Sequence, residues 1–158
     1  MIERLLRAIF PMSFLHRMLE LYLSIDKRER EAATGYVFFQ GKMLVIRQSY
    51  GTQRWTYPGG FVHPKEVPET GLRREVFEEV GLLLTRVKLI EKTTDSRKNH
   101  NITVHRFYAE AKTDKTIPDK VEVLETKWVP FEELSRYVSG DHYIERAKTF
   151  YTHYAYDA

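Results

Sequence analysis

Three glutamates, Glu75, Glu78 and Glu79, have a spacing that would place their carboxylates on one face of a helix. Like charges repel one another there, and the helix dipole disfavours anions near a C-terminal end. A solvated acidic surface is the ordinary explanation for clustered glutamates. A hard divalent cation would instead relieve the repulsion, and oxygen-only ligands favour Mg²⁺ or Mn²⁺ over zinc or copper. The spacing therefore favours a metal site over a merely solvated face.

The element that must position these carboxylates is a helix, predicted from Pro68 to Val80. Proline suits the first helical turn, because its missing N–H would have no helical partner there. Gly81 suits the position just past the helix end, where a left-handed backbone is needed. A buried stripe is expected from the apolar residues that recur every four positions: Leu72, Val76 and Val80.

The segment from Gly60 to Leu82 resembles the Nudix box, G-x5-E-x7-R-E-U-x-E-E-x-G-U, in which U is a bulky aliphatic residue. Every specified position is filled, by Gly60, Glu66, Arg74, Glu75, Val76, Glu78, Glu79, Gly81 and Leu82. Two habits of the family are missing. Lys65 stands where a glycine is frequent, and Gly71-Leu72-Arg73 replaces the usual small residues. Gly71 inside the helix should cost about 1 kcal/mol relative to alanine.

The resemblance implies a hydrolase that splits the diphosphate bridge of a nucleoside diphosphate linked to another group, with Mg²⁺ as the cofactor and Mn²⁺ as an alternative. By their position in the box, Glu75, Glu78 and Glu79 would be metal ligands, and the carbonyl of Gly59 or Gly60 would add another. The same resemblance implies that Glu78 and Glu79 are catalytic, supported by the pair Arg74 and Glu66.

The resemblance also implies a general base, either a box glutamate or a carboxylate in a loop just before a late strand. Glu122 fits the second location and is preferred, with Glu125 as the alternative; a plain surface acid is the ordinary explanation of both. Substrate contacts are expected from Arg47, Arg54 and Tyr50, although exposed basic residues commonly have no specific role.

The composition fits one globular domain of 158 residues, with 42% hydrophobic and 30% charged residues. A net charge of +3 is too small to indicate a nucleic-acid partner, and it fits a site for anionic phosphates only weakly. The absence of cysteine excludes disulfides, thiol catalysis and zinc–thiolate sites. A cytoplasmic location is the natural expectation.

The chain divides into an N-terminal helical extension with a charged connector, residues 1–33, and a main domain, residues 34–158. The main domain interleaves strands and helices around a mixed sheet. Strands are expected at residues 35–40, 43–48, 55–57, 86–92, 102–111 and 126–129, with later helices at 131–138 and 141–154 and polar loops at 93–101 and 112–120. Pattern alone indicates α/β or α+β, and the resemblance implies the Nudix α/β/α sandwich.

The first 25 residues carry two apolar helical stripes separated by Pro11. Charges interrupt both stripes, so neither reaches the roughly 20 apolar residues of a membrane span. Three interpretations remain open: helices packed on their own domain, a homodimer interface, or an amphipathic segment on a membrane surface.

The substrate is expected to be a nucleotide-type small molecule, with nucleotide sugars or ADP-ribose ahead of nucleoside triphosphates. The sequence Tyr57-Pro-Gly-Gly60 differs from the Gln-Gly-Gly that is usual in RNA pyrophosphohydrolases. The alternative function is a Nudix-fold module that binds a nucleotide without cleaving it, although such modules usually lose box carboxylates.

Overall fold

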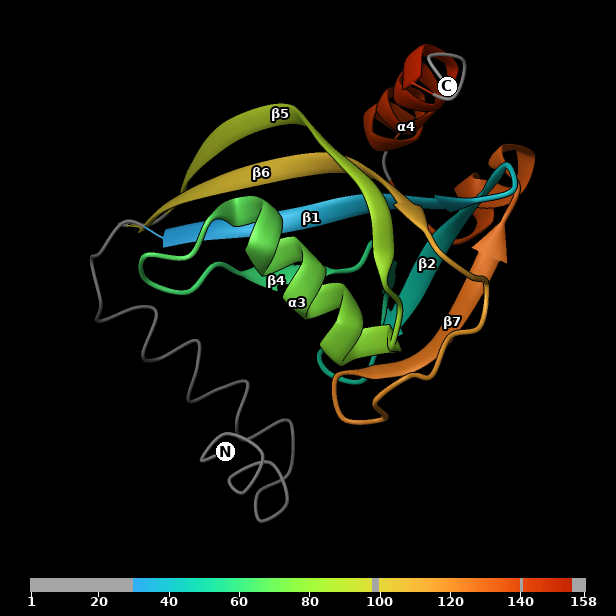
Figure 1. The fold of residues 1–158 in the computed structure, drawn as a ribbon, viewed down its shortest axis with the longest axis horizontal. Helices are drawn as coiled ribbons and strands as arrows, with labels where there is room; N and C mark the ends of the chain where they lie inside the picture. Colours follow the sequence, from blue (N-terminus) through green and yellow to red (C-terminus); the bar gives the residue numbers. More distant parts are fainter. Residues whose placement is uncertain (1–29, 98–99, 140, 155–158) are drawn as a thin grey trace.

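A computed structural model describes residues 30–97, 100–139 and 141–154. Its centre is one seven-stranded mixed sheet with few helices (Figure 1). The strands are β1 Arg30–Phe39, β2 Lys42–Gln48, β3 Trp55–Thr56, β4 Gly59–Phe61, β5 Leu84–Arg97, β6 His100–Ala111 and β7 Val123–Val129. The helices are α3 Pro68–Val80, the 3-10 helix η1 Phe131–Arg136 and α4 Asp141–Tyr154.

The sheet runs in the order β3-β2-β1-β6-β5, with β4 beside β1 and β7 beside β2. Only β1 and β6 are parallel to each other among these pairs. The predicted hairpin between the first two strands is confirmed, since Phe39 pairs with Lys42 across the turn residues Gln40 and Gly41. Both turn residues have positive φ, as a tight two-residue hairpin requires.

Strand β1 separates two hydrophobic cores, because its side chains point alternately to opposite faces of the sheet. Ala33 and Val37 pack on the face that α3 covers. Tyr36 and Phe38 pack on the other face, against residues of η1 and α4. The expected mixed α/β sheet of the Nudix type is therefore confirmed, with helices on both faces of the sheet.

Helix α3 spans Pro68–Val80, as predicted, with Pro68 in the first turn. Gly81 has φ 71°, and its N–H donates to the Phe77 carbonyl, which closes the helix in the left-handed conformation that the sequence predicts. Leu72, Val76 and Val80 are fully buried, so the apolar stripe faces the sheet.

Several elements differ in extent from the sequence prediction. Residues 93–101 were expected to be a loop, but β5 extends to Arg97 and β6 begins at His100. Polar residues support this part of the hairpin across the strands, since the hydroxyl groups of Thr94 and Thr103 lie 3.2 Å apart. The charged connector was expected to run to residue 33. Its last four residues, Arg30–Ala33, instead belong to β1 and pair with β6.

The expectations for the first 29 residues lie outside the described residues, and so do those for a homodimer or a membrane contact through that segment. The helix expected at 131–138 is the shorter 3-10 helix η1. In the described ranges, no helix combines the length and the apolar character needed to cross a bilayer.

Candidate functional site

Two glycines allow α3 to approach the sheet at strand β4. Gly60 faces Glu75 so closely that a Cβ atom added to it would lie 2.5 Å from the Glu75 carboxyl carbon. Gly59 has φ 143°, and a Cβ there would lie 2.1 Å from the carbonyl oxygen of Ala33. Any side chain at these positions would push the helix or strand β1 away. The glycine pair thus sets the distance between the glutamates and the sheet.

Arg74 binds three carboxylates of the site, those of Glu66, Glu75 and Glu78. Its Nε and Nη2 donate to the two oxygens of Glu66 at 3.0 and 2.9 Å, and Nη2 also donates to the Phe61 carbonyl at 3.0 Å. Nη1 donates to Glu75 at 2.7 Å and to Glu78 at 3.3 Å. This bidentate contact with Glu66 fixes the plane of the Arg74 guanidinium. Arg74 and Glu66 therefore form the predicted pair.

Arg74 holds the Glu66 carboxyl in its ionised form. The Arg74 hydrogen bonds lower its pKa from 4.5 to about 2, and the backbone N–H of His63 adds to this effect. A Cβ at Gly71 would lie 3.1 Å from Glu66 Oε2, so the glycine inside the helix leaves room for this carboxylate. Lys65 has φ 70°, a left-handed conformation, which explains why glycine suits the position before Glu66.

Glu79 is the most deeply buried acid, with 6% of its surface exposed. Its Oε2 accepts a hydrogen bond from the Gly59 N–H at 3.0 Å. Burial raises the pKa of this carboxyl well above its usual value, and the nearby charges of Glu75, Asp119 and Glu78 raise it further. A carboxylate in this position needs a positive partner to stay ionised.

The other two glutamates of the face differ in exposure. Glu75 is mostly buried, and burial raises its pKa even though Arg74 opposes the shift. Glu78 has 58% of its side chain exposed. Across the described residues, no three His, Cys, Asp or Glu side chains are grouped so that they could hold a metal ion. Arg74 binds the carboxylates of Glu75 and Glu78.

The donor set nevertheless fits a hard divalent cation. It offers carboxylate oxygens alone, and the buried Glu79 has like charges rather than a cation beside it. The space that a Cβ at Gly60 would fill lies directly against Glu75. A cation bound by these oxygens would compete with Arg74 for Glu75 and Glu78.

Asp119 joins the site, and the sequence analysis missed it. Its backbone N–H donates to the Glu79 carbonyl at 3.0 Å. Its carboxylate accepts hydrogen bonds from the backbone N–H groups of Val121, Glu122 and Val123. An Asp in a polar turn before a strand is a common signal for this type of bonding, but nothing in the sequence indicates contact with the helix.

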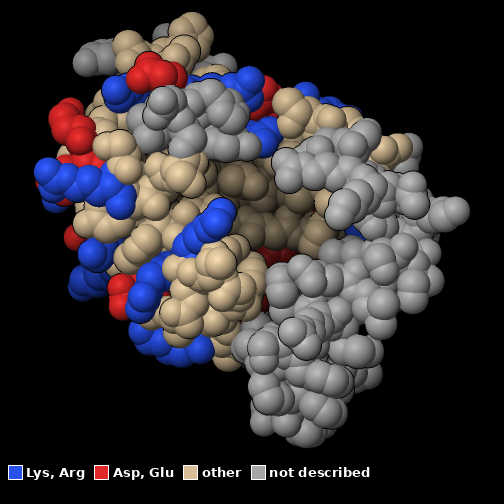
Figure 2. Space-filling view, turned by 180° about the vertical axis from the view of Figure 1, so that it is seen from behind, with Lys and Arg blue, Asp and Glu red and all other residues tan. Residues whose placement is uncertain are grey.

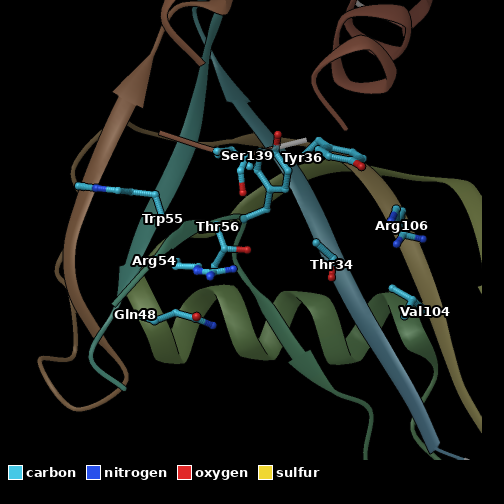
Figure 3. A pocket seen from close by; sticks show the side chains of 11 residues that line it. Thr34, Tyr36, Gln48, Arg54, Trp55, Thr56, Val104, Arg106 and Ser139 are labelled. Atoms are coloured by element: carbon cyan, nitrogen blue, oxygen red, sulfur yellow. The ribbon is translucent and has the colours of Figure 1, made fainter. Parts of the chain in front are cut away.

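A cavity of about 400 Å³ opens on the face of the sheet opposite α3. Figure 2 shows this side of the molecule hollowed near its centre, with basic side chains beside the hollow. In Figure 3 the lining side chains come from β1, the end of β2, β3 and its flanking residues, β6 and the residues after η1. The lining consists of Thr34, Tyr36, Gln48, Arg54, Trp55, Thr56, Tyr57, Val104, Arg106, Val138 and Ser139.

The cavity and the glutamates meet at Gly59. This residue pairs with Thr34, which lines the cavity, while its N–H reaches Glu79 on the other side of the sheet. The backbone of Gly35 also donates to the Pro58 carbonyl at 3.0 Å. Gly59 thus connects the wall of the cavity to the carboxylates, although no box glutamate lines the cavity itself.

The candidate substrate residues divide between the cavity and its surroundings. Arg54 lines the cavity, as a substrate contact would. Arg47 and Tyr50 are not among the lining residues. Arg47 donates to Glu125 at 2.7 Å, and the Tyr50 hydroxyl accepts from Gln48 at 2.7 Å.

Comparison with known proteins agrees with the fold. The NUDIX domain family matches residues 29–151. A MutT NUDIX hydrolase from Burkholderia pseudomallei superimposes with a TM-score of 0.62 at 19% identity, over 76% of this chain and 95% of that one. A NUDIX family hydrolase from Clostridium perfringens gives 0.65 at 19% identity, over 76% and 94%.

A local match in sequence is closer but shorter. An RNA pyrophosphohydrolase from Proteus mirabilis is 44% identical over 54 residues, which is 34% of this chain and 30% of that protein. The same name belongs to a relative from Yersinia enterocolitica, 43% identical over 54 residues. The chain spans about 30% of the length of these curated relatives.

Proposed function

Because the chain belongs to the NUDIX domain family, we propose that it is a pyrophosphohydrolase that cleaves the diphosphate bridge of a nucleoside diphosphate linked to another group. One observation carries the proposal. Gly59 pairs with the cavity-lining Thr34, and its N–H donates to the buried Glu79, so one residue connects the cavity to the box carboxylates. The phosphates of a nucleotide bound in the cavity would be directed towards this residue.

Glu75, Glu78 and Glu79 would hold Mg²⁺, or Mn²⁺ in its place, with a carbonyl from Gly59 or Gly60 as an added ligand. The bound cation would neutralise phosphate oxygens and orient the attacking water. Arg74 and Glu66 support the site by fixing where these carboxylates stand.

Glu122 is the preferred general base. Its backbone N–H bonds to Asp119, which is itself attached to the Glu79 carbonyl, so it belongs to the same end of α3. Glu125, the alternative, forms an ion pair with Arg47 at 2.7 Å. A base must lie within hydrogen-bond reach of the attacking water, directly or through one more water.

The cavity supports a small nucleotide as the substrate, with ADP-ribose or a nucleotide sugar preferred. Its volume of about 400 Å³ is in the range of small-molecule sites. Arg54 makes no ion pair or side-chain hydrogen bond with any described residue, so its charge is available for a phosphate. The 5′ end of a triphosphorylated RNA is the second candidate, because partial relatives carry the name RNA pyrophosphohydrolase.

The test is a substrate panel with Mg²⁺ and product identification by mass. The panel contains ADP-ribose, nucleotide sugars, dinucleoside polyphosphates, nucleoside triphosphates and 5′-triphosphate RNA. We expect one preferred compound, and Glu79→Gln should lower kcat for it by about 100- to 1,000-fold, as the loss of a charged catalytic group does.

Glu69→Gln is the matched control. Glu69 lies on the same helix, but its ion-pair partner is Arg73, whereas the box glutamates Glu66, Glu75 and Glu78 pair with Arg74. It should retain wild-type turnover. Equal turnover by Glu79→Gln and wild type would exclude the proposed mechanism, whereas binding without turnover across the whole panel would favour the nucleotide-binding module.

A further inference from the structure

The loop between β6 and β7 is attached to the C-terminal end of α3. The backbone N–H groups of Ile117 and Asp119 donate to the carbonyls of Val80 and Glu79, at 2.8 and 3.0 Å. Carbonyls in the last turn of a helix have no partner within the helix, so these bonds also cap α3. These bonds fix the position of the loop relative to Glu79, the residue that carries the buried carboxylate.

Asp119 organises the turn that follows. One carboxylate oxygen accepts from the N–H groups of Val121, Glu122 and Val123 at 3.1, 3.0 and 2.9 Å. Lys120 has φ 63°, which bends the backbone so that successive N–H groups point inward. Such a concave row of N–H groups is a binding site for an anion. Here the Asp119 side chain is that anion.

Both backbone groups of Glu122, its N–H and its carbonyl, are hydrogen-bonded. Its N–H bonds to Asp119, and its carbonyl accepts from the N–H of Ser49 at 2.8 Å. The Ser49 hydroxyl also bonds to the Val121 carbonyl. Ser49 directly follows β2, whose last residue, Gln48, lines the cavity. Glu122 thus stands between the end of α3 and the cavity wall, with its main chain fixed.

We propose that Asp119 is a positioning residue that sets Glu122 against the end of α3, so that Glu122 serves as the base from a fixed backbone. The inference rests on the proposed function, since it takes Glu122 as the base. The competing explanation is that Asp119 only stabilises a surface turn.

The test compares Asp119→Ala with Asp119→Asn, using the panel compound that the wild-type protein turns over fastest. Alanine removes every acceptor, and we expect kcat to fall about 10- to 100-fold with KM nearly unchanged, since the base is misplaced but the cavity is intact. Asparagine keeps a carbonyl oxygen that accepts N–H groups, so it should restore most of the lost turnover.

A double-mutant cycle separates positioning from stability. Glu122→Gln should lower kcat by itself, and adding Asp119→Ala to it should cause no further loss, because the residue being positioned is already disabled. A turn that only stabilises the fold would give additive losses. Thermal unfolding of each variant measures the folded fraction directly, and Asp119→Ser replaces the alanine variant if the latter does not fold.

Asp114→Asn is the control, because Asp114 is an exposed acid of the same loop whose contact with Trp128 uses only its backbone carbonyl. It should retain wild-type kcat. Wild-type kcat in Asp119→Ala, or equal losses in the alanine and asparagine variants, would overturn the inference while leaving the proposed function standing. A wild-type protein that turns over nothing in the panel would overturn both.

Discussion

The two faces of strand β1 carry two different kinds of site. On the α3 face, every box side chain described above already has a partner: Arg74 binds three glutamates, and the Gly59 N–H binds Glu79. On the other face, the cavity leaves about 400 Å³ open, and the Arg54 side chain makes no hydrogen bond or ion pair with a described residue.

This difference indicates that the two faces have different roles. The network of Arg74 and its glutamates is preorganised, because its charged groups are already hydrogen-bonded to one another. Replacing any one member should therefore displace the others. An open cavity with an unpaired cation gains its partners only from a ligand. Changes on the α3 face should therefore affect stability and turnover, whereas changes on the cavity face should affect substrate binding.

The largest effect is expected where the two faces meet, from Gly59→Ala. The added Cβ would lie 2.1 Å from the Ala33 carbonyl, and φ 143° disfavours any side chain. We expect a loss of about 3 kcal/mol in the free energy of unfolding, measured by urea denaturation. Gly51→Ala is the control, because Gly51 also has positive φ but has nothing within 4 Å of an added Cβ. Similar losses in both would show that contact with β1 is unimportant.

The same contrast explains what could be predicted from sequence. The box residues lie in one continuous segment, so helical periodicity and the glycine at position 81 suffice to place α3 and its carboxylates. The cavity takes residues from β1, β2, β3, β6 and the segment after η1, and no short-range pattern joins them. Asp119 was missed for the same reason, since its bond to Glu79 depends on where the loop docks.

The second effect concerns the ion pair on the α3 face, which Glu66→Gln removes. The pKa of Glu66 is about 2 when folded, against 4.5 ordinarily, so its ionisation stabilises the fold above pH 4.5. This contribution is lost as the pH falls from 4.5 towards 2. We expect the variant to be about 2 kcal/mol less stable at neutral pH.

The measurement is urea unfolding of both proteins at neutral pH and at about pH 3, where the difference should shrink. Glu69→Gln, which removes an exposed pair with Arg73, should cost no more than about 0.5 kcal/mol. A Glu66→Gln deficit that stays constant with pH would show that the ionised pair is not its cause.

A smaller effect, on binding alone, is expected from Arg54→Ala on the cavity face. Loss of a charge-assisted hydrogen bond to a phosphate should raise KM about tenfold and leave kcat and the unfolding midpoint nearly unchanged. Steady-state kinetics with the preferred panel compound measure this. Arg136→Ala, at an exposed arginine of η1 outside the cavity lining, is the control. A fall in kcat without a change in KM would contradict the proposed division between the faces.

The smallest effect is a gain in stability, from Lys65→Gly beside the ion pair. Lys65 has φ 70°, which costs a residue with a Cβ about 1 kcal/mol and a glycine almost nothing. The greater freedom of glycine in the unfolded chain offsets part of the gain, so we expect about 0.5 kcal/mol from urea denaturation. Lys120, with φ 63°, is the comparison: its Nζ donates to the Leu124 carbonyl at 2.7 Å, and Lys120→Gly would lose that bond. Lys120→Gly should therefore gain less stability than Lys65→Gly. If Lys120→Gly gained more, relief of backbone strain would not explain why the family frequently has glycine before the first box glutamate.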